Sequence, residues 1–62
     1  MTPTKTRVKI VTGHLDMAII YLVRYGDGTK QFYSVETMDE TKEFFGFVAA
    51  LSYAEKIAGT KL

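Results

Sequence analysis

Residues 17–25, Met-Ala-Ile-Ile-Tyr-Leu-Val-Arg-Tyr, decide the fold that this sequence predicts. Successive side chains of a β-strand point to opposite faces of its sheet, so a strand with one face in water alternates apolar and polar residues. This stretch has no charged residue before Arg24. It therefore predicts a strand that needs apolar neighbours on both of its faces.

The segment before this strand has the alternating pattern of a strand with one face in water. Residues 5–11 place basic side chains on one face and β-branched side chains on the other. The basic ones are Lys5, Arg7 and Lys9, and the β-branched ones are Val8 and Ile10. This period of two is typical of β-structure. Residues 1–4 precede the strand and are expected to be flexible.

A turn signal follows the central strand. Asp27-Gly28 lies between two segments rich in β-branched and aromatic residues, which is typical of a β-hairpin and predicts a third strand over residues 30–36. A two-residue turn at this position pairs Tyr25 with Lys30, whereas a longer or bulged loop shifts the register by one residue.

One face of the sheet is expected to receive a helix, which leaves apolar side chains on the other. The expected core set is Ile20, Leu22, Tyr33 and Val35, joined by Val8 and Ile10. The set left on the opposite face is Ile19, Tyr21, Val23, Tyr25 and Phe32. The reverse assignment stays open, but either one leaves an apolar face uncovered because the central strand is apolar throughout.

The last third of the chain predicts a helix over residues 38–58. Thr37-Met38-Asp39-Glu40 matches a capping box, in which the Thr37 hydroxyl accepts the Glu40 amide and Glu40 reaches back to the Thr37 amide. Gly59 suits the left-handed position after a helix, and Lys56 and Lys61 suit its negative end.

The predicted helix has two apolar rows. The row expected to pack on the sheet is Phe44, Phe47, Val48, Leu51, Ala54 and Ala58, at i, i+3, i+4 spacing. The second row is Phe45, Ala49, Tyr53 and Ile57, and Gly46 and Ala50 lie between the two. A helix flank that carries Phe45, Tyr53 and Ile57 would be an exposed apolar patch of the kind that binds partners.

These elements predict one α+β domain over residues 1–62, a three-stranded antiparallel meander followed by a carboxy-terminal helix. A domain of this size buries only about 60% of the surface of its unfolded chain. The sequence contains no cysteine and one histidine, which excludes disulfides, thiolate metal sites and multi-histidine sites within one chain. No apolar run approaches the roughly 20 residues that a membrane span needs. Because the sequence also has no cysteine and no recognisable export signal, we expect a cytoplasmic protein, and we expect no metal or cofactor.

The surplus of apolar side chains predicts a non-enzymatic module that acts by protein–protein association. The partner that covers the surplus apolar surface is expected to be a second copy of the chain in a homodimer, or another protein to which this chain binds as an accessory or inhibitor-type module. The candidate contact residues are Phe45, Tyr53 and Ile57 on the helix and Ile19, Tyr21 and Val23 on the sheet. The competing interpretation is a strongly curved sheet that wraps the helix and buries nearly all of these side chains.

Nucleic-acid binding is the alternative function. Basic residues interleaved with aromatic ones are typical of single-strand binders, in which rings stack on bases and cations follow phosphates. The candidates are Arg7, Lys9, Arg24, Lys30, Tyr25 and Tyr33. Three strands followed by a helix also resemble the arm-type DNA-binding domains of some integrases, which lay their sheet in the major groove. That resemblance is one of topology, and no motif in the sequence carries it.

Other chemistry-bearing residues have simpler structural explanations. His14 and Asp16 could form a general base and its orienting partner, but no nucleophile stands at a recognisable position, and both suit a turn. Gly26-Asp27-Gly28 lies between strands, whereas a phosphate loop leads into a helix. The acidic residues Glu36, Asp39, Glu40 and Glu43 are accounted for by the expected helix start.

Overall fold

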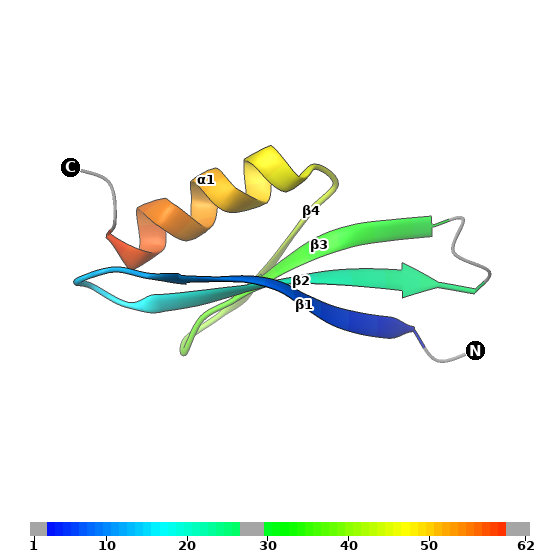
Figure 1. The fold of residues 1–62 in the computed structure, drawn as a ribbon, viewed down its shortest axis with the longest axis horizontal. Helices are drawn as coiled ribbons and strands as arrows, with labels where there is room; N and C mark the ends of the chain where they lie inside the picture. Colours follow the sequence, from blue (N-terminus) through cyan, green and yellow to red (C-terminus); the bar gives the residue numbers. More distant parts are fainter. Residues whose placement is uncertain (1–2, 27–29, 60–62) are drawn as a thin grey trace.

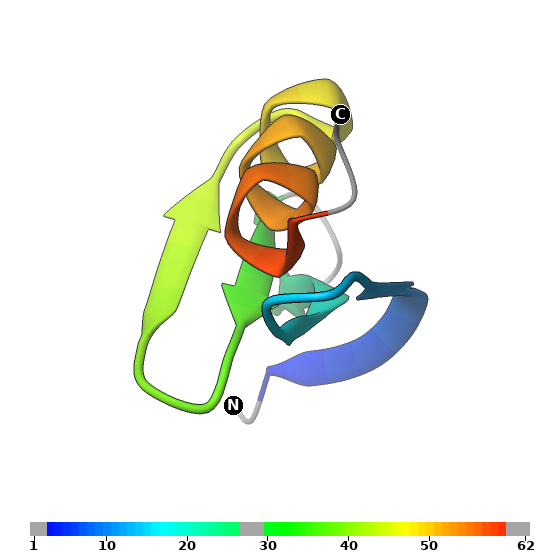
Figure 2. The same ribbon diagram turned by 90° about the vertical axis from the view of Figure 1, so that its left-hand side faces the viewer.

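The structure is a computed structural model that describes residues 3–26 and 30–59. Its elements are β1 (Thr4–Thr12), β2 (Met17–Tyr25), β3 (Lys30–Glu36), β4 (Thr41–Phe44) and α1 (Phe47–Ala58). The strands form one antiparallel sheet in the order β1-β2-β3-β4, and α1 packs on one face of it (Figures 1 and 2). The predicted α+β class is confirmed, but the sheet has four strands rather than three.

The pairing of β2 with β3 has the register that the sequence predicts. Tyr25 pairs with Lys30, Val23 with Phe32 and Ile19 with Glu36. The Asp27-Gly28 turn itself lies outside the described residues, as do residues 1–2 of the expected flexible lead. Thr4 of that lead is already the first residue of β1.

The segment Thr37–Glu40 closes a turn between two strands and does not begin a helix, so the capping-box interpretation is wrong. The Glu40 amide donates to the Thr37 hydroxyl oxygen at 3.2 Å, and the Thr37 amide donates to the Glu40 carbonyl at 2.9 Å. A threonine hydroxyl can accept an amide three residues on in a turn as well as at a helix start. The chain therefore continues into β4, and the helix begins at Phe47 instead of Met38.

A β-bulge in β1 changes which of its side chains face the helix. Arg7 pairs with Tyr21 and Lys9 pairs with Ile20, so Val8 is the extra residue of the bulge. The alternation of β1 reverses there. The predictions that Val8 and Ile10 join the core and that Arg7 and Lys9 share a face are therefore wrong, and Val11 occupies the core position instead, 5% exposed.

The core is a close contact between the helix and the two central strands. Ala50, Ala54 and Ala58 follow one another at intervals of four along α1, and all three are 0% exposed. Ile20 and Val35 are the large side chains buried completely beneath them. Small side chains at this spacing allow the helix backbone to approach the sheet closely.

The helix presents a slightly different face to the sheet from the one expected. Ala50, predicted to lie between the two apolar rows, is at the centre of the contact, while Val48, predicted to be in the core row, is 77% exposed. Phe47 and Leu51 pack against the edge of the core. The expected left-handed conformation of Gly59 is confirmed, with φ of 80°.

The helix is shorter than the central strand β2 that it covers. Twelve helical residues extend about 18 Å, whereas the nine residues of β2 extend about 30 Å. Figure 1 shows the start of β1 and the adjoining ends of β2 and β3 continuing past the helix. The sheet is therefore uncovered along this end as well as over its opposite face.

We expect Gly13→Ala to destabilise the protein by about 1–3 kcal/mol through overpacking. The Leu15 and Asp16 amides donate to the Ala58 carbonyl at 3.0 and 3.2 Å, which joins the β1–β2 turn to the end of α1. A Cβ atom on Gly13 would lie 2.1 Å from that same oxygen. Chemical denaturation measures the loss.

Gly46→Ser is the matched control for this substitution. A Cβ atom at Gly46 meets nothing within 4 Å. At the residue before a helix, serine and glycine differ in their effect on stability by only about a few tenths of a kcal/mol. An unchanged denaturation midpoint in Gly13→Ala would contradict the close approach of turn and helix.

Candidate interaction surface

The face of the sheet away from α1 carries a continuous set of apolar side chains. Because Ile20 is buried beneath the helix, Ile19 and Tyr21 point to the other side, and the strand pairing extends that alternation across the sheet. We call this surface the open face. Its apolar members are Ile10, Met17, Ile19, Tyr21, Val23, Tyr25 and Phe32.

The apolar members of the open face remain substantially accessible to water. Ile10, Met17 and Tyr25 are 43%, 47% and 42% exposed. Ile19, Tyr21 and Phe32 are half-buried, and only Val23 is buried by its neighbours. The rings of Tyr25 and Phe32 are stacked with their centroids 5.7 Å apart. Contiguous apolar surface of this kind marks interaction sites more often than scattered exposed side chains do.

Phe45 adds a large exposed side chain at the β4 edge of the open face. It follows the last residue of β4 and is 93% exposed. Together with Phe32, Glu43 and Phe44 it lines a surface hollow of about 290 Å3. The sequence predicted Phe45 as an exposed residue on a helix, but it precedes α1 and lies beside the open face.

Tyr53 and Ile57, predicted as contact residues together with Phe45, lie on a different surface. Both are half-buried on α1. The Tyr53 ring packs 5.2 Å from the Phe44 ring, and its hydroxyl donates to Glu40 Oε1 at 2.9 Å. Tyr53 therefore fastens the helix to β4 and its preceding turn. The six predicted contact residues thus divide into Ile19, Tyr21, Val23 and Phe45 at the open face, and Tyr53 and Ile57 on the helix side.

A lysine lies across the middle of the open face. Lys5 of β1 forms an ion pair with Glu36 of β3, and its Nζ is 4.2 Å from the centroid of the Tyr21 ring between them. The hydrogen bond to Glu36 raises the pKa of Lys5 above its ordinary value, so the lysine stays charged. Exposed ion pairs contribute little to stability, and an incoming partner can displace this side chain.

The residues predicted to bind nucleic acid do not share one face. Arg7, Lys30 and Tyr25 belong to the open face, because they pair with or neighbour residues of that face. The other three, Lys9, Arg24 and Tyr33, belong to the helix side. Tyr33 packs edge-on against Phe47 at 5.5 Å between ring centroids. The bulge at Val8 causes the separation of Arg7 from Lys9, and no periodicity in the sequence reveals it.

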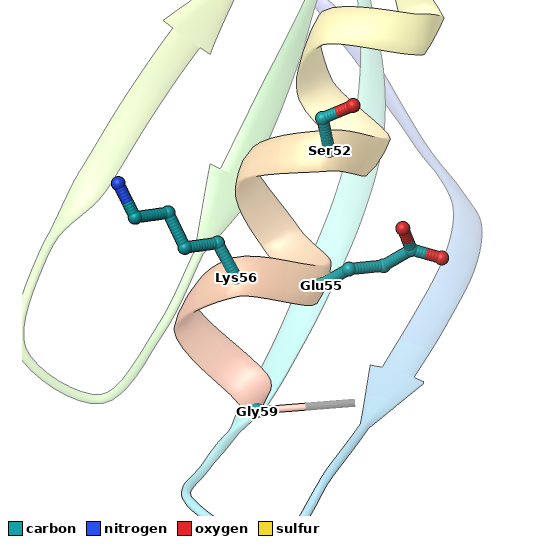
Figure 3. Close-up of a pocket in the computed structure, with 4 residues that line it drawn as sticks. All are labelled: Ser52, Glu55, Lys56 and Gly59. Atoms are coloured by element: carbon teal, nitrogen blue, oxygen red, sulfur yellow. The ribbon is translucent and has the colours of Figure 1, made fainter. Parts of the chain in front are cut away.

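The remaining polar groups do not converge on one point. A hollow of about 420 Å3 beside α1 is lined by Ser52, Glu55, Lys56 and Gly59. Figure 3 shows the side chains of Ser52, Glu55 and Lys56 spreading from the helix in different directions. A small-molecule site needs a few polar groups that point toward the same ligand, and these three do not supply them.

The expectation that Glu36, Asp39, Glu40 and Glu43 lie at a helix start is wrong, because the first turn of α1 contains no acidic residue. Asp16, Glu36 and Glu40 have local roles instead. Asp16 Oδ1 accepts the Met17 amide at 2.7 Å, as expected of turn chemistry. Glu36 binds Lys5 and Glu40 binds Tyr53. Within residues 3–26 and 30–59, no three histidine, aspartate or glutamate residues are grouped so that they could hold a metal ion.

Comparison with protein-family models, with curated proteins and with solved structures finds no match to this chain. In the described part of the chain, no helix has the length and apolar character needed to cross a membrane.

The hydrogen bond to Glu40 raises the pKa of Tyr53 above its ordinary value of 10.0. We expect Glu40→Gln to lower it again, because the amide carries no negative charge. A folded-state pKa above the unfolded one means that the bond stabilises the fold fully below about pH 10, and that this contribution is lost as pH rises through the folded pKa.

An NMR titration that follows the Tyr53 ring measures this effect. Asp39→Asn is the matched control, since it removes a neighbouring negative charge and keeps the hydrogen bond. The same Tyr53 pKa in Glu40→Gln as in the unaltered protein would show that the tyrosine is not held by this carboxylate.

Proposed function

We propose that this protein is a small non-enzymatic binding module that acts by protein–protein association through its open face. The observation that carries the proposal is the exposure of large apolar side chains there while α1 occupies the other face. Phe45, at 93% exposed, and the accessible Tyr25 and Met17 support it most directly.

Removal of the open face from water would supply the free energy of association. Burial of apolar area contributes roughly 25 cal/mol per Å2, and aromatic side chains at the centre of an interface often dominate its affinity. Tyr21, Tyr25, Phe32 and Phe45 are such side chains on one accessible surface. The rings of Tyr25 and Phe32 already stack on one another, so they would lose little conformational freedom when a partner binds.

The charges of the open face favour a protein over a nucleic acid. Lys5, Arg7 and Lys30 are accompanied on the same face by Glu36 and Glu43. The two carboxylates offset two of the three cations and leave one net positive charge, whereas binding a phosphate backbone needs a mainly basic surface. A cytoplasmic location is part of the proposal and is supported by the cysteine-free composition.

We expect Phe45→Glu to weaken the association at least about tenfold, which corresponds to about 1.4 kcal/mol. The fold should persist, because Phe45 makes little contact with the core. Sedimentation equilibrium at micromolar protein measures the association, and circular dichroism measures helix content. Val48→Glu is the matched control, since Val48 is 77% exposed on α1 and away from the open face.

Two outcomes would contradict the proposal. One is a protein that stays monomeric and whose binding of a hydrophobic dye, if any, is unchanged by Phe45→Glu. The other is a gel shift with single-stranded DNA or RNA at low salt, where phosphate contacts are strongest, that is lost in Arg7→Glu. That second result would replace protein binding by nucleic-acid binding.

A further inference from the structure

The open face has a charge pattern that selects its occupant; this inference rests on the proposed function. Basic side chains lie along one edge strand, where β1 contributes Lys5 and Arg7. Acidic side chains lie toward the other edge, where β3 contributes Glu36 and β4 contributes Glu43, and Lys30, at the opposite end of β3 from Glu36, is a further basic residue of this face. The apolar side chains of β2 run between them. The open face thus carries both basic and acidic side chains that could pair with each other across two copies of the surface.

Arg7 and Glu43 lie in the same row of the sheet. Arg7 pairs with Tyr21, Tyr21 with Ser34, and Ser34 with Glu43. Three strand spacings separate the two ends of that row, or about 14 Å, which is too far for an ion pair within one molecule. Within the described residues, the ion pair on this face is the one between Lys5 and Glu36. Arg7 and Glu43 remain available for contacts with another molecule.

Two copies of the open face can stack about a two-fold axis in two simple ways. An axis perpendicular to the strands places β1 over β1 of the second copy, and brings Arg7 toward its own symmetry mate. An axis parallel to the strands places β1 over β4 of the second copy. Arg7 then lies over Glu43 of the second copy, and symmetry repeats this contact. The first arrangement is repulsive and the second is attractive.

We propose that the occupant of the open face is a second copy of this chain, related by a two-fold axis parallel to the strands. In this arrangement Tyr21 lies over the small, 5% exposed Ser34 of the second copy, and Val23 lies over its Phe32. Large side chains face small ones, which allows the two layers to interdigitate. Stacked sheets cross at about 30°, so the contacts of this central row are the best preserved.

The size of the open face predicts a weak dimer. Three strands paired over about seven residues, and β4 paired over four, cover roughly 400 Å2, given the usual strand spacing and rise. Stable complexes bury about 800 Å2 on each partner. The dimer is therefore expected to dissociate in the micromolar range and to depend strongly on the two Arg7–Glu43 contacts.

A charge-swap experiment tests the geometry. Arg7→Glu and Glu43→Arg should each raise the dissociation constant at least about tenfold, because each places like charges opposite one another twice. An equimolar mixture of the two variants should restore association, since every contact in the mixed dimer joins opposite charges. Lys9→Glu, on the same strand but on the helix side, is the matched control and should leave the dissociation constant unchanged.

Sedimentation equilibrium of each variant and of the mixture gives the result. A wild-type dimer that both variants leave unchanged, or whose weakening the mixture does not reverse, would overturn this arrangement while leaving the proposed function in place. Unaltered protein that associates more tightly with Arg7→Glu than with itself would overturn it in favour of the perpendicular axis, because that axis places residue 7 opposite residue 7 of the second copy. A monomer at every concentration that still binds hydrophobic dye through Phe45 would also overturn it, and would assign the open face to a different protein.

Discussion

The contact between three alanines of α1 and the two central strands is the constraint on which the rest of the structure depends. Ala50, Ala54 and Ala58 bring the helix close to Ile20 and Val35. Because α1 is held this close to one face of the sheet, it cannot also cover the other face. The chain has no second layer among its described residues with which to cover the opposite face (Figure 2). The accessible aromatic side chains of the open face follow from this arrangement.

The bulge in β1 has a second, independent effect on the surface. By placing Val8 outside the ladder, it turns Val11 toward the helix and Ile10 toward the open face. It also leaves Lys5 and Arg7 on the open face while moving Lys9 to the other side. Bulges and lysines are both common on edge strands, where they discourage pairing with other chains. Here the same features concentrate basic charge along one border of the apolar surface.

The sequence was sufficient for features that depend on local pattern. The uninterrupted apolar run of β2, the pairing of Tyr25 with Lys30 and the left-handed Gly59 all follow from residue type and spacing. The surplus apolar face was predictable for the same reason. What the sequence could not separate was a threonine that caps a helix from one that closes a turn, because Thr37 makes the same bond to the Glu40 amide in both. The β4 strand and the later start of α1 depended on that distinction.

The two ends of α1 are secured very differently. At its carboxyl end, the Ala58 carbonyl accepts two amides from the β1–β2 turn, and the Gly59 amide bonds to Glu55. At its amino end, Gly46 supplies no side-chain cap and the first turn contains no acidic residue. Local opening should therefore begin at the amino end, and backbone amides there should exchange hydrogen faster than those near Ala58. Phe45 is joined directly to this less constrained end, so the most exposed ring at the edge of the open face has freedom to adjust to the partner that we propose.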